Sequence, residues 1–350
     1  MSNDLPLVVF DCERMRYANT GLYHYCLQLG NAIRNIPSDQ YEVGLYGPEQ
    51  ELINQKPPVI KWHSLNKFWF WNMPSRARIW HTTYQSSNYV PSTSRVKKIL
   101  TIHDLNFLHE IEDNPVAVQN HIRKLQKNID CFDAYICISE FAKNDLLTHI
   151  DIGNKPVQVI YNGCNRLNHN PAPAVIQPEK PFIFSLGFVN AKKNFHVLIP
   201  LLQGNDFELV IAGKHDSGDY VQKIMETATN YGVEKRVKLV GPISENDKAW
   251  YFRNCSLFAF PSLAEGFGLP VVEAMQFGKP LLLSKKTSLP EVGGEVACYF
   301  EDESPEAMQF AMKLALSTAK EREKDIKTRA GFFDWHETAL QHHRLYQSML

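Results

Sequence analysis

Short apolar runs alternate with helical stretches along the chain, and this alternation constrains the fold more than any other feature. Each run is only a few residues long and rich in apolar and β-branched side chains. Such runs are typical of strands that are covered on both faces of a parallel sheet. Because helices separate the runs, the pattern predicts a parallel α/β domain. The runs of the first set lie at 7–10, 42–46, 59–62, 79–81, 98–102, 134–138 and 157–161.

The composition changes abruptly after the first set of runs. Residues 165–181 include four prolines and three asparagines with little periodicity, which predicts an exposed linker at 166–181. A chain of 350 residues with 44% apolar content is long enough for two hydrophobic cores. We therefore expect two Rossmann-like domains, at 1–165 and 182–334. The second set of runs lies at 182–186, 208–212, 237–240, 256–260 and 280–283, interleaved with helices such as 217–231 and 269–277.

Charge and cysteine usage exclude several classes of protein. A formal net charge of −1 argues against a nucleic-acid-binding protein, which needs a surplus of lysine and arginine on one face. The seven cysteines form no C-x-x-C pair, which indicates free thiols in a reducing compartment. The run HEIED has Asp113 where a zinc metalloprotease helix needs its second histidine. These features predict a protein without a structural metal or a disulfide framework.

The apolar runs also bear on location. The first run meets Asp11 too early for a signal peptide, and no apolar stretch approaches the roughly 20 residues that cross a bilayer. We therefore expect a cytoplasmic protein. Residues 67–78, KFWFWNMPSRAR, combine four consecutive aromatic rings with cations, a mixture that favours the lipid interface. The alternative is that these rings pack beneath a loop or line an acceptor cleft, since Pro74 interrupts any long amphipathic helix.

One segment combines glycines, a proline and two carboxylates in a pattern suited to a phosphorylated ligand. PSLAEGFGLPVVEAM has a Gly-Phe-Gly turn and then Pro270, which suits the first position of a helix. A helix N-terminus binds phosphate through its unpaired N–H groups, and glycines let the ligand approach the backbone. Glu273 is expected in the first helical turn, where it would accept hydrogen bonds from ribose hydroxyls, and Glu265 is expected at the turn itself. The alternative is an ordinary strand, turn and helix with an acidic residue near its start.

This segment resembles the donor-site motif of the family 4 retaining glycosyltransferases, in which seven residues separate two glutamates. VIYNGCN at 159–165, LGFVNAKKN at 186–194 and ISEFAKNDLL at 138–147 follow the order of that family, so the resemblance covers nearly the whole chain. It implies the GT-B fold, in which two Rossmann-like domains face each other across a cleft. It also implies that the helix expected at 335–350 crosses back onto the first domain.

The resemblance also implies roles for individual residues. The residues expected to take part in catalysis are Glu265, His103 and Lys193. Thr20 and Gly21 are expected in a loop near the acceptor or phosphate, although from the sequence alone a plain helix cap by Asn19 or Thr20 is at least as good an interpretation. The residues expected to bind the donor are Lys192, Gly187, Gly266, Phe267, Gly268, Leu269, Glu273 and Gly213.

Several of these candidates also satisfy a physical rule, because ligands of doubly wound sheets bind beyond the carboxyl ends of the strands. His103 follows such a strand and could hydrogen-bond a sugar hydroxyl or stabilise charge at the reacting carbon, or it could be satisfied locally. Lys192 and Lys193 place cations where a diphosphate leaving group must be neutralised. Many family members carry an arginine where this chain has Phe188. Lys192 either replaces that cation or is a solvated residue.

The predicted activity is retaining transfer of a hexose-type sugar from GDP-mannose or a UDP-sugar to a hydroxyl of a glycan or lipid-linked acceptor. The pathway expected from the family is bacterial surface-polysaccharide assembly. No metal and no cofactor besides the nucleotide sugar are implied. The alternative is a non-catalytic sugar-nucleotide-binding subunit of a glycosyltransferase complex. An oxidoreductase is disfavoured because no strand is followed by G-x-G-x-x-G.

Overall fold

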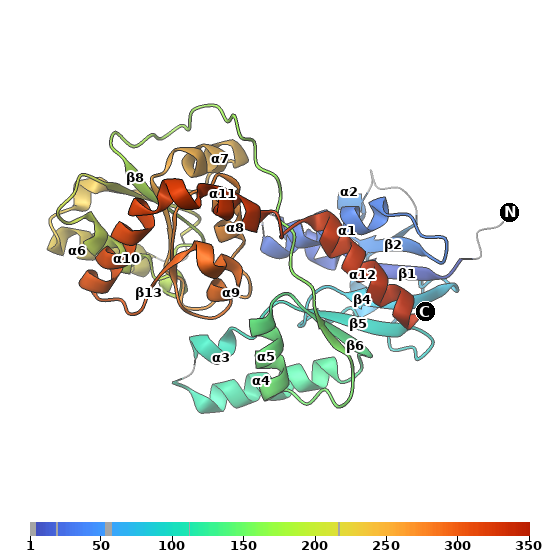
Figure 1. Cartoon of the computed structure of the whole chain (residues 1–350). Coiled ribbons are helices and arrows are strands. Elements are labelled where there is room, and N and C mark those ends of the chain that lie inside the picture. The colour runs from blue at the N-terminus through green and yellow to red at the C-terminus, as the bar shows by residue number, and fades with distance from the viewer. Residues whose placement is uncertain (1–4, 19, 53–57, 112, 216–217) are drawn as a thin grey trace. The chain divides into compact units, whose positions relative to one another are not determined.

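The computed structural model describes residues 5–18, 20–52, 58–111, 113–215 and 218–350 (Figure 1). The described chain forms two compact units. Unit 1 extends to Gly163 and also includes Asp334–Leu350, while unit 2 comprises Cys164–Phe333. The segment expected as a linker, 166–181, therefore belongs to unit 2. No helix among the described residues is both long enough and apolar enough to cross a membrane.

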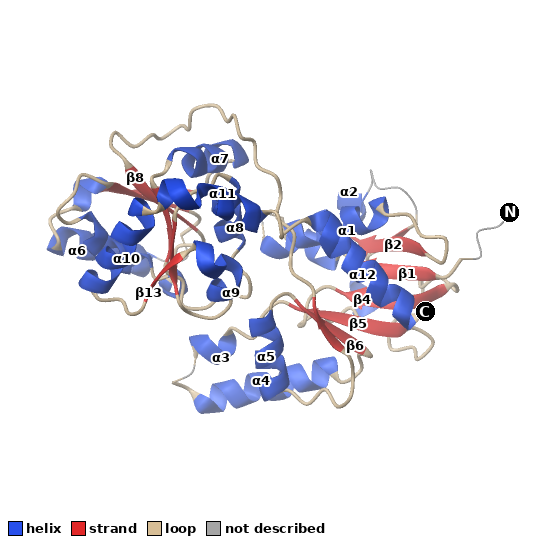
Figure 2. Cartoon of the chain, viewed as in Figure 1, coloured by secondary structure: helices blue, strands red, loops and turns tan. Residues whose placement is uncertain are grey.

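Unit 1 is built on a seven-stranded sheet with the order β3-β2-β1-β4-β5-β6-β7 (Figure 2). Every neighbouring pair is parallel, as the short apolar runs predicted. The strands are β1 (Leu7–Asp11), β2 (Glu42–Gly47), β3 (Val59–Lys61), β4 (Ala77–Thr82), β5 (Lys97–Ile102), β6 (Ala134–Cys137) and β7 (Val157–Val159).

Helices and one long loop cover the two faces of this sheet. One face packs against α1 and α12, and the other packs against α4 and α5 over β5 and β6. Over β1, β2 and β4, that second face is covered by Trp62, Phe70 and Met73 from the loop after β3. The helices are α1 (Gly21–Asn35), α2 (Glu49–Leu52), α3 (Phe107–Glu110), α4 (Pro115–Ile129), α5 (Glu140–His149) and α12 (Trp335–Met349), with 3-10 turns η1 (Glu13–Arg16) and η2 (Ser64–Lys67).

The C-terminal helix α12 belongs to the core of unit 1, as expected from the resemblance. Tyr346 is fully buried, and its hydroxyl lies 2.6 Å from His81 Nδ1 on β4. Lys97 Nζ on β5 donates to the Met349 carbonyl oxygen at 2.7 Å. These contacts join the end of the chain to the middle of the first sheet.

Unit 2 is a six-stranded parallel sheet with the order β10-β9-β8-β11-β12-β13. Its strands are β8 (Phe182–Leu186), β9 (Glu208–Ala212), β10 (Val237–Gly241), β11 (Leu257–Phe260), β12 (Leu281–Ser284) and β13 (Cys298–Phe300). Its helices are α6 (Gly218–Asn230), α7 (Glu245–Asn254), α8 (Leu269–Gln276), α9 (Leu289–Gly293), α10 (Pro305–Ser317) and α11 (Ala319–Ala330), with 3-10 turns η3 (Ala191–Lys193), η4 (Phe195–Leu202), η5 (Glu234–Arg236) and η6 (Gly294–Val296).

The segment 166–181 is held against α7 by hydrogen bonds, although its prolines prevent regular structure. The amide nitrogen of Ala172 donates to Asn246 Oδ1 at 3.0 Å, and Asn246 Nδ2 donates back to the Ala172 carbonyl oxygen at 3.1 Å. Tyr251 donates its hydroxyl to the Ile176 carbonyl oxygen at 2.6 Å. The segment is therefore a strap on unit 2.

Both sheets share the doubly wound order, which determines where ligands bind. In unit 1, β2 and β3 lie on one side of β1, and the strands from β4 onward lie on the other side. In unit 2, β9 and β10 lie on one side of β8, and the strands from β11 onward lie on the other. The helices that follow two such strands lie on opposite faces, which leaves a crevice at their carboxyl ends. The loops after β1, β4 and β5 in unit 1, and after β8, β9 and β11 in unit 2, are therefore the places to look for a site.

Candidate functional site

Three glycines lie at the carboxyl ends of neighbouring strands in unit 2. Gly187 follows β8, Gly213 follows β9, and Gly241 ends β10. The amide nitrogen of Gly213 donates to the Gly241 carbonyl oxygen at 2.8 Å. A Cβ atom on Gly213 would lie only 1.9 Å from the Gly187 carbonyl oxygen, so no other residue fits there. This end of the sheet therefore presents backbone that a ligand can approach closely.

Lys193 is held beside this glycine pair by the short turn η3. Asn190 begins the turn, and its side chain accepts a hydrogen bond from the Lys193 amide nitrogen at 3.2 Å. A Cβ atom on Gly187 would lie 3.1 Å from Lys193 Cε, so the glycine leaves room for the lysine stem. The ammonium group lies 4.8 Å from the centroid of the Phe260 ring at the end of β11. The lysine head is thus directed across the ends of β8 and β11.

Lys193 forms an ion pair with Glu265, and the structure thereby brings two predicted catalytic residues together. Both side chains are largely buried, with 13% and 14% of their surface exposed. The backbone of Glu265 is fixed as well, because its amide nitrogen donates to Thr287 Oγ1 at 2.9 Å and its carbonyl oxygen accepts from Ser288 Oγ at 2.8 Å. A ligand anion at this position would compete with Glu265 for the lysine.

The glycine-rich turn leads into α8 as the sequence predicted. Gly268 is the N-cap, with a φ of 94° that suits glycine, and Pro270 lies in the first turn. Phe267 is 4% exposed, and its ring packs edge-on against Phe333 at a centroid distance of 5.4 Å. Phe267 therefore offers a donor its backbone only. At the start of α8 the Leu269 N–H has no partner within the helix, whereas Pro270 carries no N–H and the Val271 amide nitrogen donates to the Gly268 carbonyl oxygen at 2.9 Å.

Glu273 does not lie in the first turn of α8, which corrects one expectation from the sequence. The helix begins at Leu269 and has no acidic residue in its first turn. Glu273 lies one turn further along, and its Oε1 is 2.7 Å from Lys248 Nζ on α7. The same ammonium group lies 2.9 Å from Glu245 Oε1. Glu273 is therefore a member of a buried ion-pair network and gains nothing from the helix dipole.

Burial and charge compete within this network. Burial raises the pKa of Glu273, and the neighbouring Lys248 opposes that rise. For Lys248 burial works in the other direction, but the ion pairs and hydrogen bonds with Glu273 and Glu245 prevail and raise its pKa. Glu273 therefore has a cation beside it, although only 12% of its side chain is exposed. Lys248 was missed from the sequence, since nothing in the local pattern connects residues 25 positions apart.

The backbone of Lys192 joins two of the loops at this edge. Its carbonyl oxygen accepts a hydrogen bond from the Leu263 amide nitrogen at 2.9 Å, which ties the loop after β8 to the loop after β11. Phe188, which replaces the family's arginine, is 40% exposed. That Lys192 supplies the missing positive charge stays a prediction.

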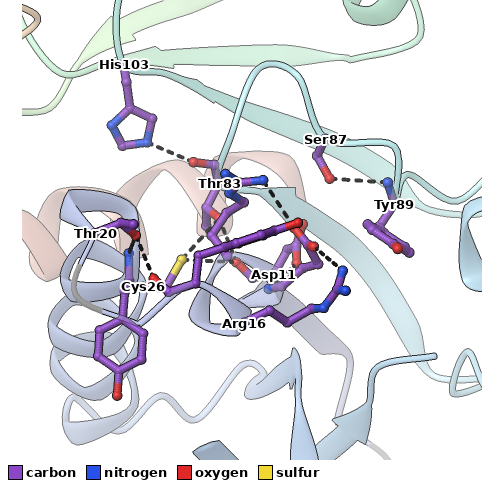
Figure 3. Close-up of polar contacts among 12 residues, drawn as sticks. Asp11, Arg16, Thr20, Cys26, Thr83, Ser87, Tyr89 and His103 are labelled. Carbon is purple, nitrogen blue, oxygen red and sulfur yellow. Dashed lines mark hydrogen bonds and ion pairs between the residues drawn. The ribbon is translucent and has the colours of Figure 1, made fainter. Parts of the chain in front are cut away.

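In unit 1, His103 follows β5, and its imidazole ring is hydrogen-bonded to Thr83 (Figure 3). Its Nε2 lies 2.8 Å from the Thr83 carbonyl oxygen, which only accepts, so Nε2 carries the proton and Nδ1 is left as an acceptor. Its ring packs edge-on against Tyr25 at 4.7 Å. Burial lowers the pKa of His103 to about 4, with a further contribution from the nearby Arg14. His103 is therefore neutral at neutral pH and suited to accept a hydrogen bond from a hydroxyl.

The ends of β1 and β4 are joined beside this histidine. Thr83 donates its hydroxyl to the Asp11 carbonyl oxygen at 2.8 Å, and Asp11 Oδ1 accepts from the Glu13 amide nitrogen at 2.8 Å (Figure 3). Burial raises the pKa of Asp11 well above its ordinary value. Arg14 stacks its guanidinium 4.5 Å from the ring centroid of Tyr84. These polar groups line the carboxyl edge of the first sheet.

Thr20 and Gly21 lie at the start of α1. Thr20 is the N-cap, and its hydroxyl oxygen accepts from the Tyr23 amide nitrogen at 3.2 Å. It also donates to the Tyr17 carbonyl oxygen at 2.8 Å. No atom lies within 4 Å of a Cβ built on Gly21, so the helix start is open there. The neighbouring Asn19, also considered as a cap, lies outside the described residues.

Among the residues that the structure describes, no three histidine, cysteine, aspartate or glutamate side chains are grouped so that they could hold a metal ion. Lys193 and Lys248 place positive charge beside Glu265 and Glu273.

Comparison with known proteins identifies the family of the chain. Residues 32–166 match the model described as Glycosyltransferase Family 4, and residues 168–330 match the model described as Glycosyl transferases group 1. The chain belongs to this glycosyltransferase family. Among its curated relatives is the Serotype-specific mannosyltransferase WbdA of Escherichia coli, 28% identical over 267 residues, or 69% of this chain and 32% of that protein. The O-antigen chain mannosyltransferase B of Escherichia coli is 22% identical over 74% of this chain and 72% of that protein.

The glycosyltransferase chain spans about a third of the length of its WbdA relatives. Solved structures confirm the GT-B fold. The sucrose-phosphate synthase from Thermosynechococcus elongatus superposes with a TM-score of 0.75 at 18% identity, over 98% of this chain and 99% of that one. Anabaena HepE in complex with UDP and glucose superposes with a TM-score of 0.71 at 18% identity, over 98% of this chain and 100% of that one.

Proposed function

We propose that this glycosyltransferase moves a hexose-type sugar from GDP-mannose or a UDP-sugar to a hydroxyl of a glycan or lipid-linked acceptor, with retention of anomeric configuration. The single observation that carries the proposal is the buried ion pair of Lys193 and Glu265 beside the bare backbone of Gly187 and Gly213. A nucleotide sugar presents both of the groups that this pair would bind, a diphosphate and a ring of hydroxyls.

In the proposed reaction the ion pair is exchanged for two contacts with the donor. A diphosphate oxygen takes the place of Glu265 on Lys193, and the released carboxylate accepts hydrogen bonds from sugar hydroxyls. As the sugar–phosphate bond breaks, negative charge grows on the phosphate, and the fixed ammonium and the start of α8 at Leu269 stabilise it. Lys192 adds positive charge in place of the arginine replaced by Phe188. The departing phosphate takes the acceptor proton, so the proposal assigns no part to a metal or another cofactor.

Glu273 and Lys248 would hold the nucleoside. Glu273 Oε1 lies 2.7 Å from Lys248 Nζ, and this cation opposes the burial that raises the pKa of the carboxyl group. An ionised carboxylate is the natural acceptor for the paired hydroxyls of a ribose. Burial of the group strengthens this hydrogen bonding.

In unit 1, neutral His103 would accept a hydrogen bond through Nδ1 from a sugar hydroxyl. The names of the mannosyltransferase relatives support GDP-mannose and surface-polysaccharide assembly, and the UDP and glucose bound to HepE support a UDP-sugar. The proposed place of action is the cytoplasm, in peripheral contact with the inner face of a membrane through residues 67–78.

A panel of nucleotide sugars tests the proposal. GDP-mannose, UDP-glucose, UDP-galactose and UDP-N-acetylglucosamine are scored for thermal stabilisation and for slow donor hydrolysis. One member should raise the melting temperature of the wild type, and Glu273→Gln should weaken that effect while Glu245→Gln, which removes the other partner of Lys248, should not. Hydrolysis or transfer should require Lys193, and the rate should be the same in EDTA. Donor binding without hydrolysis or transfer across an acceptor panel would favour a non-catalytic subunit.

A further inference from the structure

The loop after β3 exposes an unusual set of large apolar side chains. Leu65, Phe68, Trp69 and Trp71 have 52%, 75%, 73% and 51% of their surface exposed. We refer to these four side chains as the aromatic face. Phe70, in the middle of the same run, packs instead on Trp80 at 4.8 Å between ring centroids. The loop therefore packs Phe70 against the sheet and leaves the aromatic face exposed to solvent.

A buried polar network holds the loop in the shape that exposes these rings. Asn66 is 1% exposed, and its Oδ1 accepts from the His63 amide nitrogen at 2.9 Å and from the Tyr46 hydroxyl at 3.2 Å. Its Nδ2 donates to Asn72 Oδ1 at 3.1 Å. Asn72 Nδ2 in turn donates to the Lys61 carbonyl oxygen at the end of β3, at 2.8 Å. The exposure of the aromatic face is thus built into the fold.

The aromatic face lies within the most basic part of the chain. Residues 52–103 contain no aspartate or glutamate and eight lysines and arginines, although the whole chain has a formal net charge of −1. Glu42 and Glu49, from outside this segment, pair with Arg76 and Lys61. Lys67 lies on the aromatic face itself, with Nζ 4.8 Å from the Phe68 ring centroid. Lys98 is buried, so among the described residues of this segment the exposed cations left to attract an anionic surface are Lys67, Arg78, Arg95 and Lys97.

The loop also starts at the carboxyl edge of the sheet, where Thr20 and Gly21, which are expected near the acceptor, begin α1. It starts at the carboxyl end of β3, and Trp62 at its beginning lies under the guanidinium of Arg16, 3.8 Å from the ring centroid. Arg16 pairs with Glu13 at 3.0 Å, next to the end of β1 (Figure 3). A surface bound by the aromatic face would therefore lie on the acceptor side of unit 1.

We propose that the aromatic face inserts into the interface of an anionic lipid bilayer. Tryptophan and phenylalanine rings partition to the headgroup level, and lysines beside them are attracted to anionic headgroups. A glycan or a second copy of the chain accounts for the rings but not for a basic segment of this length. The inference rests on the membrane contact proposed above, but not on the transfer reaction, because vesicle binding needs no donor.

Vesicle binding by the full chain tests the inference. Wild type should co-sediment with vesicles of phosphatidylglycerol and phosphatidylcholine at low salt, and less with phosphatidylcholine alone. Phe68→Ser with Trp69→Ser should weaken binding by about tenfold or more, while Phe310→Ser, which changes a ring 71% exposed in unit 2, should not. Lys67→Gln should weaken binding less and should flatten its dependence on salt. All four changed side chains are exposed, so thermal unfolding should stay that of wild type.

Three results would overturn the inference. The first is wild type that does not bind anionic vesicles at low salt. The second is a Phe68 and Trp69 double variant that binds as wild type does. The third is concentration-dependent dimerisation that the double variant abolishes, without vesicle binding, which would assign the face to a second copy. Transfer to a short soluble acceptor should be unchanged in the double variant, so failure here and failure of the transferase proposal are separate outcomes.

Discussion

Replacing Lys248 by methionine should make the stability of the protein depend on pH in a specific way. Methionine keeps the length of the side chain but leaves the Glu273 carboxylate buried without its cation. Removing one partner of a buried ion pair costs about 3–5 kcal/mol, because the other charge stays buried and uncompensated. Glu273 can escape part of that cost by taking up a proton.

The free energy needed to protonate Glu273 sets an upper limit on the loss of stability, and this limit can be calculated. With an ordinary glutamate pKa of 4.5, neutralising the carboxyl group costs about 3.4 kcal/mol at pH 7 and about 0.7 kcal/mol at pH 5. In the variant the folded-state pKa of Glu273 lies above the unfolded value. The loss of stability is therefore small near the unfolded pKa and grows as the pH rises toward the folded one. We expect a loss of about 2–3 kcal/mol at pH 7 and under about 1 kcal/mol at pH 5.

Urea unfolding at the two pH values measures this difference, with Lys248→Met and Glu273→Gln combined as the control. The double variant has no buried charge at either position, so its stability should approach that of wild type and should lose the pH dependence. A loss in Lys248→Met that is equal at pH 5 and pH 7 would refute the reasoning. So would a double variant that recovers less than half of the loss at pH 7.

Further predictions concern the glycine pair, the catalytic ion pair and the histidine. Gly213→Ala should unfold or distort unit 2, because its Cβ atom would lie 1.9 Å from the Gly187 carbonyl oxygen, and the melting temperature of the variant measures this. Lys193→Ala should lower turnover by about a hundredfold or more while donor binding persists, which single-turnover assays separate. Because the pKa of His103 is about 4, the histidine should stay neutral between pH 6 and pH 8. A pH–rate profile should therefore show no change in turnover over that range that depends on His103.

Each of these three predictions has a contrary result. A Gly213→Ala protein with wild-type stability would mean that the strand ends separate easily. Equal losses of binding and turnover in Lys193→Ala would assign the lysine to donor binding alone. A rate that falls as the pH drops from 8 to 6, and that loses this fall in His103→Asn, would mean that the histidine titrates near its ordinary pKa.

The positions of most strands and their parallel type could be predicted from the sequence because the signal is local. The runs at 182–186 and 208–212 have the same bounds as β8 and β9. The strand β13 was missed, since Cys298–Phe300 has three residues and no alternation long enough to recognise. Glu273 was placed one turn too early, although the helix was expected to begin at 269: α8 does begin at Leu269, and Glu273 is its fifth residue, beyond the first turn.

The candidate site likewise has one part that the sequence predicts and another part that only the tertiary structure shows. The sequence by itself determined the two sets of parallel strands and the glycine-rich turn into α8, because side-chain periodicity and backbone preferences depend on near neighbours. Only the tertiary structure decided which charges meet. Lys193 pairs with a glutamate 72 positions away and Lys248 with one 25 positions away. Burial, which also makes His103 neutral, is a property of the packed chain, and no local pattern of residues encodes it.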